Sequence, residues 1–198
     1  MDARRIPEYT LELSADRSSV RDVVKGILHT IFFHRFFTPL RPATHDVLDI
    51  TLPFVSDEDI EKLVEARSTS LLRALDIAST QQSPQYSSKP GRGALVVQFM
   101  EKKRRKAGWF GAKGEEETPW EIWVIDVTLT SARNEQEAAK NRRAMEKSLQ
   151  KAAMQVATLV NMERNHVPPI TTNETNPFPY QILVNPKNDG WPQRLGIF

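Results

Sequence analysis

Cysteine is absent from this 198-residue chain. The chain can therefore form no disulfide, no thiolate zinc site and no cysteine nucleophile, and the absence fits a reducing compartment. Histidine is scarce as well, and the sequence has only His29, His34, His45 and His166. His29 and His34 lie five positions apart on one predicted helix, which is not the i, i+4 spacing of a metal-binding pair. We assign all four histidines to structural or surface roles and expect no metal site.

Long apolar runs are missing too. No run approaches the ~20 residues that a membrane-spanning helix needs. The first ten residues lack the apolar core of a secretory signal. The net charge is only +2, so no overall field attracts nucleic acid. With 39% hydrophobic and 26% charged residues, we expect a soluble cytoplasmic protein whose residues 1–198 form a single domain.

The motifs of common catalytic sites are not found. There is no Walker-type Gly-Lys-Ser/Thr and no nucleophile elbow. The glycines of Gly91-Arg92-Gly93 precede a predicted strand instead of following one, so they lack the context of a dinucleotide-binding loop. The acidic residues 57–59 open a predicted helix, where they favour the helix dipole. We therefore expect no enzymatic activity, no catalytic residue and no cofactor.

Hydrophobic periodicity in the first half predicts strands and helices in alternation. Residues 8–14 alternate and indicate a strand. Ser18 or Ser19 then caps a helix, whose apolar stripe has helical spacing and predicts one buried face: Val20, Val23, Val24, Ile27, Leu28, Ile31 and Phe32. Residues 45–52 indicate one short strand. Ser56 and Asp59 resemble a capping box at the start of a second helix, with the apolar stripe Ile60, Leu63, Val64, Leu71, Ala74, Leu75 and Ala78.

The second half begins with a polar connection at 79–93, followed by strands at 94–100 and 120–129. Strict alternation on the second strand predicts two apolar faces: Trp123, Ile125, Val127 and Leu129 on one, and Trp120, Ile122 and Val124 on the other. We expect this strand to be central and covered on both sides. A long helix at 133–164 carries the stripe Met145, Leu149, Ala152, Val156, Leu159 and Val160, and its charged first half should face solvent or a partner. The proline-rich segment 166–198 contains one short strand, 180–184, and the whole pattern is α+β.

The most informative stretch is the loop 102–118, which joins the two strands of the predicted hairpin. Five basic residues open the loop: Lys102, Lys103, Arg104, Arg105 and Lys106. Trp109 and Phe110 follow, with Gly108 and Gly111 on either side, and an acidic triplet closes the loop. Leaving each ring in water forgoes roughly 1.5–3 kcal/mol of burial. We interpret this pattern as a projecting aromatic finger whose rings are buried by a partner.

Other interpretations of the loop stay open at this point. The two rings can fold back against the domain, since exposed aromatic pairs are uncommon in monomers. The basic run can be a solvated flank that protects a strand from edge pairing. It can also contact anionic lipid transiently, or serve as a nucleic-acid or nuclear-localisation patch. A nucleic-acid surface would need stacking aromatics spaced among the basic residues, and the loop has one adjacent pair, so we expect no nucleic-acid partner.

Several segments resemble the autophagy-related protein 101 family. They are Leu28–Arg35, the basic run leading into Trp109-Phe110, the motif Pro119-Trp-Glu-Ile-Trp123, the helix end Asn161–His166 and the continuation to Pro179-Tyr180. The resemblance covers about residues 8–185. The Trp-Phe pair followed by Pro-Trp-Glu-x-Trp is its most specific part.

The resemblance implies a HORMA domain, with three main helices packed on a β-sheet and no C-terminal belt closed over a peptide. It implies a non-catalytic adaptor in the complex that activates the autophagy-initiating kinase, located in the cytoplasm at the site of autophagosome assembly. Members of the family pair with the HORMA domain of autophagy-related protein 13 as a heterodimer. In this sequence, Trp109 and Phe110 take the place of the family's finger, which recruits downstream autophagy factors.

Two rival functions belong to other classes. The first is a closed HORMA module that captures a peptide, which needs two paired strands after residue 166, whereas the sequence indicates one. The second is a membrane-surface or nucleic-acid binder that uses the basic run 102–106. Salt-dependent binding to anionic liposomes or oligonucleotides would identify this second rival.

Overall fold

The computed structural model describes residues 6–80, 91–104, 115–171 and 176–186. Within these ranges the elements follow the order β1 (Glu8–Asp16), α1 (Val20–Arg35), β2 (Ala43–Val47), β3 (Ile50–Phe54), α2 (Glu58–Thr80), β4 (Arg92–Arg104), β5 (Glu115–Thr130), α3 (Glu135–Met162) and β6 (Tyr180–Val184). The α+β fold class is confirmed, and β6 has the bounds that the sequence predicted.

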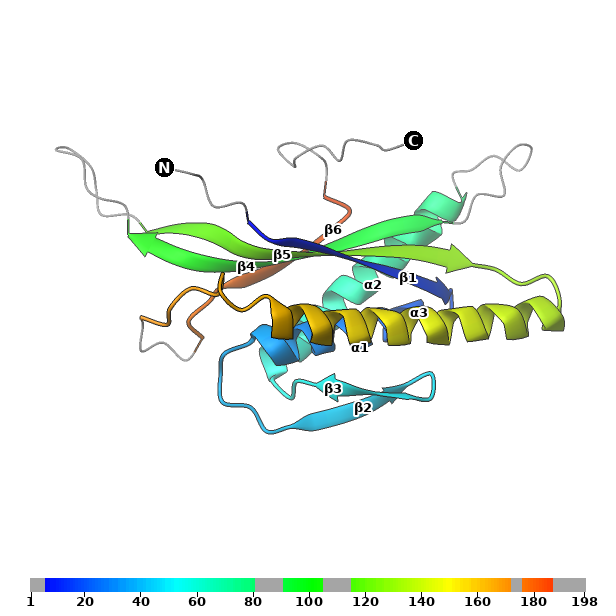
Figure 1. Ribbon diagram of the computed structural model, residues 1–198. Helices are drawn as coiled ribbons and strands as arrows, with labels where there is room; N and C mark the ends of the chain where they lie inside the picture. The colour runs from blue at the N-terminus through cyan, green and yellow to red at the C-terminus, as the bar shows by residue number, and fades with distance from the viewer. Residues whose placement is uncertain (1–5, 81–90, 105–114, 172–175, 187–198) are drawn as a thin grey trace.

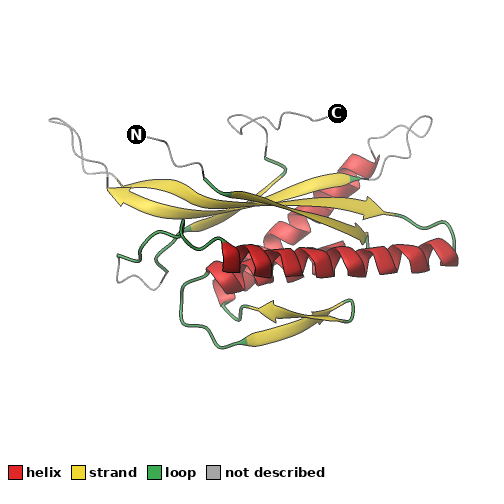
Figure 2. Ribbon diagram, viewed as in Figure 1, coloured by secondary structure: helices red, strands yellow, loops and turns green. Residues whose placement is uncertain are grey.

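A four-stranded sheet in the described residues has the order β1-β5-β4-β6. β1 runs parallel to β5, while β4 is antiparallel to both β5 and β6. The three helices lie together on one face of this sheet, as Figures 1 and 2 show. This arrangement agrees with the three helices on a sheet that the family resemblance implies. β5 is central, as its two apolar faces predicted.

The outer face of the sheet carries a smaller apolar cluster. Val96, Ile122 and Val124 are buried there, and the partly buried Ile6 and Leu183 pack against them. The helices therefore cover one face of β5. On its second face, Ile122 and Val124 pack with these side chains of β4, of β6 and of the segment before β1. The predicted cover on both sides of β5 is therefore confirmed only in part, because the helices lie on one face and the other face carries only this small apolar cluster in the described residues.

α1 is buried on nearly all sides instead of on one stripe. Gly26, His29 and Thr30 are buried together with the predicted apolar residues. The reason is the β2–β3 hairpin, which packs against the side of α1 that faces away from the sheet (Figure 1). A Cβ at Gly26 would lie 2.8 Å from Leu52 Cδ1, so the absence of a side chain allows this close approach.

The hairpin corrects the prediction of one strand at 45–52. Leu48 and Asp49 have φ values of 50° and 63°, the positive values of a tight two-residue hairpin turn. Asp46 and Thr51 face each other across this turn, with the Thr51 hydroxyl donating to Asp46 Oδ1 at 2.6 Å. Residue type did not indicate this turn, because a leucine at positive φ is uncommon.

Of the two predicted helix caps, Ser19 does occupy the N-cap position of α1, whereas the predicted cap of α2 is wrong by one residue. The Ser19 side chain makes no capping hydrogen bond; instead the Ser19 N–H donates to Asp16 Oδ1 at 2.8 Å. At α2 the cap is Asp57, whose Oδ1 accepts from Ile60 N–H at 3.1 Å, instead of Ser56. α3 has a regular cap, because Asn134 accepts from Glu137 N–H.

The long helix follows its predicted phase. The buried residues of α3 are Met145, Leu149, Ala152, Val156 and Val160, and Leu159 is half-buried. They pack against β1 and α1. The charged first turns, residues 135–140, are exposed as predicted. Their exposure leaves a charged helical surface available to a partner.

Candidate functional site

β4 and β5 continue past their neighbours at one end of the sheet. β1 pairs with β5 only over residues 122–130, and β6 pairs with β4 only over residues 95–99. The antiparallel ladder between β4 and β5 nevertheless extends to Arg104 and Glu115. We call residues 100–104 and 115–119 the arm, and Figure 1 shows it projecting beyond the rest of the sheet. The predicted hairpin is thereby confirmed, but its strands are longer than predicted, because the two-stranded ribbon continues through residues 102–104 and 115–118, which the sequence assigned to the loop.

The register of the arm sets basic residues opposite acidic ones. Lys102 pairs with Glu117, Lys103 with Glu116 and Arg104 with Glu115. Directly opposed residues of opposite charge contribute roughly 0.2–1 kcal/mol per pair. An isolated two-stranded ribbon is marginal in water, so opposite charges at positions such as Lys102 and Glu117 favour this register. The sequence signal for this register is that residues 102–104 and 115–117 lie at equal distances from the centre of the loop.

The tip of the finger lies outside the described residues. It comprises residues 105–114, with Arg105, Lys106, Gly108, Trp109, Phe110 and Gly111 among them. Their predicted roles in recruitment therefore stay predictions. The structure shows where the strands that lead into and out of this tip are held, which is at the outer end of the arm.

A β-bulge marks the base of the arm. Phe99 pairs with Glu121 and Met100 pairs with Pro119, which leaves Trp120 as an extra residue on β5. The bulge reverses the alternation, so Trp120 joins the same core cluster as Trp123 instead of Ile122 and Val124. The predicted placement of Trp120 on the outer face is therefore wrong, because strict alternation does not continue through an inserted residue.

Trp120 packs among aromatic side chains from three parts of the chain. Its ring centroid lies 5.9 Å from Phe99, 5.2 Å from Phe178 and 5.7 Å from His166. Only 5% of Trp120 is exposed. The base of the arm is thus held by β4, by the residues after α3 and by the residues before β6.

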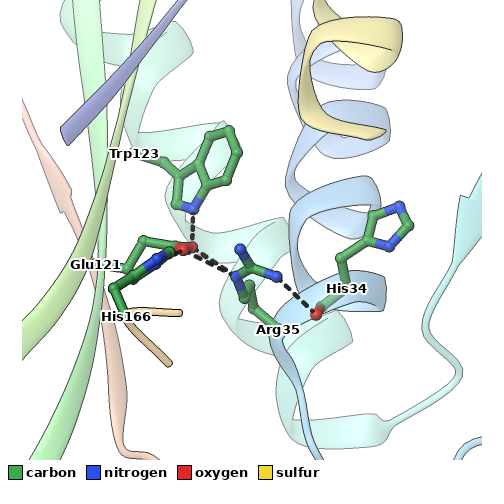
Figure 3. A network of polar contacts seen from close by, with 5 residues as sticks. All are labelled: His34, Arg35, Glu121, Trp123 and His166. Carbon is green, nitrogen blue, oxygen red and sulfur yellow. Dashed lines mark hydrogen bonds and ion pairs between the residues drawn. The ribbon is translucent and has the colours of Figure 1, made fainter. Parts of the chain in front are cut away.

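Beside Trp120 lies the buried carboxylate of Glu121, which is 0% exposed. Arg35 Nε donates to its two oxygens at 2.8 and 2.9 Å. His166 Nε2 lies 2.6 Å from Oε2, and the indole N–H of Trp123 donates to Oε1. Figure 3 shows these side chains converging from α1, β5 and the segment after α3. A charge buried this deeply is stable only when it is paired and hydrogen-bonded, as here.

Tyr9 of β1 borders this network. Its ring centroid lies 4.7 Å from Trp123 and 6.5 Å from His166. Burial, and then the negative charges of Glu121 and Glu163, raise the pKa of Tyr9 to about 12. The tyrosine therefore stays neutral beside the carboxylate at physiological pH.

Sequence reasoning missed the Glu121 network. The signal was present, because Glu121 shares its parity with Trp123, Ile125 and Val127 on the core face of β5. A carboxylate among core residues requires a cationic partner. The partner could not be named, since Arg35 lies 86 positions away in the chain.

The histidines give no sign of a metal centre. His29 is buried, and its Nδ1 accepts from Val55 N–H at 3.4 Å. Burial, and then the nearby charges of His45 and Lys25, lower the pKa of His29 to about 4. Among the residues that the structure describes, no three His, Cys, Asp or Glu side chains form a group that could hold a metal ion. The described helices also include none long and apolar enough to cross a membrane.

Comparison with known proteins identifies the family. The model of the family described as "Autophagy-related protein 101" matches residues 12–174. A protein of that name from Schizosaccharomyces pombe is 26% identical over 187 residues, which cover 94% of this chain and 91% of the relative. One from Arabidopsis thaliana is 24% identical, with 90% and 86% covered. One from Xenopus tropicalis is 28% identical, with 76% and 70% covered. The matched segment contains the whole arm and the Glu121 network, and the chain belongs to the autophagy-related protein 101 family.

Proposed function

We propose that this chain, whose family has a role in autophagy, is a non-catalytic adaptor of autophagy initiation. One surface pairs with the HORMA domain of autophagy-related protein 13, and Trp109 and Phe110 recruit downstream autophagy factors. The adaptor works in the cytoplasm at the site of autophagosome assembly. The family is not an enzyme class, which agrees with binding as the activity.

The observation that carries the proposal is the arm. It extends past β1 and β6, so the tip begins away from the helix-covered core. The side chains that the arm contributes near the tip are charged, from Glu101 to Arg104 and from Glu115 to Glu117. Such a ribbon offers no apolar bed on which Trp109 and Phe110 could be buried. A partner with an apolar pocket would bury them instead, as interface anchors of this type require.

The pairing surface that we propose is the exposed first half of α3 together with the turn of the β2–β3 hairpin. Arg142 links the two, because its guanidinium lies 3.0 Å from Asp49 and 3.0 Å from Glu146. Figure 1 shows the first turns of α3 and the arm at opposite ends of the molecule. A partner HORMA domain on α3 would therefore leave the arm accessible, which an adaptor with two simultaneous partners needs.

The alternative functions have less support. The cross-strand register sets residues 102–104 opposite acidic residues, which reduces the local positive potential that lipid or nucleic acid would require. Among residues 167–171 and 176–186, the structure has the single strand β6, paired with β4. This observation adds nothing in favour of a closed belt with two paired strands.

The first experiment tests the finger. Replacing Trp109 and Phe110 with Ala should leave the melting temperature and the pairing with the HORMA partner unchanged. Recruitment of downstream factors should be lost, because a buried aromatic anchor commonly contributes ~2 kcal/mol or more, a factor of about 30 in affinity. The matched control removes two aromatics from the tail, Trp191→Ala with Phe198→Ala, and should bind normally. Unfolding or loss of HORMA pairing in the finger variant would contradict the proposal.

The second experiment tests the pairing surface. Lys140→Glu with Arg143→Glu reverses two charges on the exposed half of α3 and should weaken HORMA pairing while finger-dependent recruitment persists. The same charge change on exposed residues of α2, Arg67→Glu with Arg73→Glu, is the matched control. Equal affinity for the HORMA partner in both variants, measured by calorimetry, would place the pairing surface elsewhere.

A further inference from the structure

The base of the arm is clamped on both of its strands by the C-terminal part of the chain. On β4, the Met100 N–H donates to the carbonyl of Pro179 at 2.7 Å. On β5, Trp120 packs against Phe178 and His166, and His166 also reaches Glu121. The chain between His166 and Pro179 is therefore attached to the arm base at both of its ends.

The clamp coincides with the bulge, the point at which the hairpin leaves the four-stranded sheet. A bulge bends its strand and increases the local twist, and two-stranded ribbons vary in twist more than wider sheets do. Beyond the bulge, neither β1 nor β6 pairs with the arm. The direction of the arm is therefore set by the contacts that hold the residues at the bulge in place.

Glu121 connects the bulge to α1 and to the segment after α3. It is adjacent to the extra residue Trp120 and accepts from Arg35 of α1 and from Trp123 of its own strand, with His166 at Oε2. Hydrogen bonds to several donors leave a buried carboxylate few alternative positions. Arg35 and Glu121 are 5% and 0% exposed, whereas His166 is 16% exposed at the edge of the network.

We propose that Glu121 is a positioning residue that fixes the direction of the arm by joining Arg35 and His166 at the bulge. Its consequence for recruitment rests on the function proposed above: an arm held in one direction presents the tip to a partner without first having to be ordered. If loosening the base reduces the fraction of correctly directed arms to about one tenth, the apparent affinity for the tip partner falls about tenfold. HORMA pairing on α3 is not affected by this loss.

The test measures the direction of the arm without any partner. Because the chain has no cysteine, spin labels can be attached at two introduced positions, Glu117→Cys on the arm and Arg67→Cys on α2, both of them exposed. The distance distribution between the labels should be narrow in the otherwise unchanged chain. It should broaden in Glu121→Gln, which turns an amide N–H₂ toward donors, and in His166→Ala. His166→Gln, which keeps a side-chain N–H donor, should restore a narrower distribution than His166→Ala.

His166→Ala keeps the test decisive if Glu121→Gln fails to fold, since His166 lies at the edge of the network. A folded His166→Ala variant with an unchanged distance distribution would overturn the proposal. The partner measurement is separate. Suppose that the label distances broaden but that recruitment does not depend on Trp109 and Phe110. This result would contradict the proposed function and support the positioning role. An unchanged distribution together with finger-dependent recruitment would do the reverse.

Discussion

α1 and the arm are held in place by different forces. α1 is covered by the sheet, by α2 and α3, and by the β2–β3 hairpin, so eleven of its sixteen residues are buried. The arm has one neighbour per strand, and its opposed residues carry opposite charges. Burial makes α1 sensitive to the shape of every side chain. The arm is held by the pairing of β4 with β5, so it should tolerate side-chain changes along its length and be sensitive to changes at its base.

The largest effect should come from opening a cavity under α1. Phe32 is fully buried, with its ring centroid 5.6 Å from Phe99 and 4.9 Å from Tyr180. Phe32→Ala should lower the free energy of unfolding by about 3–5 kcal/mol, measured by urea denaturation. The half-buried neighbour Phe33 provides the control, and Phe33→Ala should lose clearly less. Equal losses for the two variants would contradict the difference in burial between Phe32 and Phe33.

A loss of stability of intermediate size should follow when the pH is lowered, because His29 is buried at the contact between α1 and the β2–β3 hairpin. The pKa of His29 is about 4 in the folded chain and 6.5 in the unfolded chain, so the unfolded state takes up the proton first as the pH falls. The contribution of His29 is fully present above pH 6.5 and is lost as the pH falls toward 4. The difference between the two pKa values corresponds to a loss of up to about 3 kcal/mol.

This pH dependence can be isolated with His29→Asn, whose side-chain oxygen can still accept from Val55 N–H. The variant should show a flatter stability profile between pH 7 and 5 than the unchanged chain. His45 and Lys25 face His29 and contribute to the shift, so a second variant, His45→Gln, should move the His29 transition to slightly higher pH. Parallel profiles for the unchanged chain and His29→Asn would contradict the assignment to His29.

The smallest effect should come from the arm itself. Lys102→Glu sets two acidic residues opposite each other at the Glu117 pair, which should lower stability by only about 0.2–1 kcal/mol. Amide exchange should nevertheless accelerate in residues 100–104 and 115–119, since local opening is controlled by local contacts. Combining it with Glu117→Lys should restore slow exchange. A loss of several kcal/mol in global stability would show that the arm is part of the core.

Periodicity predicted the parts of this fold that depend on local pattern. The α3 stripe from Met145 to Val160 and the strand β6 were correct because a helix and a strand each repeat their buried positions at a fixed interval. The β2–β3 hairpin was missed because its turn places Leu48 at positive φ, which the residue type does not announce. Trp120 was misplaced because one inserted residue at a bulge reverses every alternation argument beyond it.

In the candidate site, too, the features that depend on local pattern were predicted and those that depend on distant contacts were not. Residues 102–118 predicted a finger because glycines, aromatics and opposite charges follow one another in a single segment; the hairpin that leads to it is confirmed, and its tip stays a prediction. The support of the hairpin was not predicted, since Arg35 and His166 resemble ordinary surface residues and lie far from Glu121 in the chain. Asp57 replaced the predicted cap Ser56 for a related reason: neighbouring side chains at the start of α2 could each accept a backbone N–H, and the backbone path selects one.

By itself, the sequence determined where the three helices and most of the strands lie, which face of α3 is apolar, and that a charged hairpin leads to a Trp-Phe pair, because each of these depends on neighbours within a few residues. The tertiary structure alone decided that α1 is enclosed, that the arm leaves the sheet at a bulge, and that a buried glutamate holds its base. Those features depend on contacts between segments far apart in the chain, as between Arg35 and Glu121, which are 86 positions apart. Such contacts are selected by the packing of the whole chain, because a buried charge or an inserted residue is stable only where partners from several elements meet.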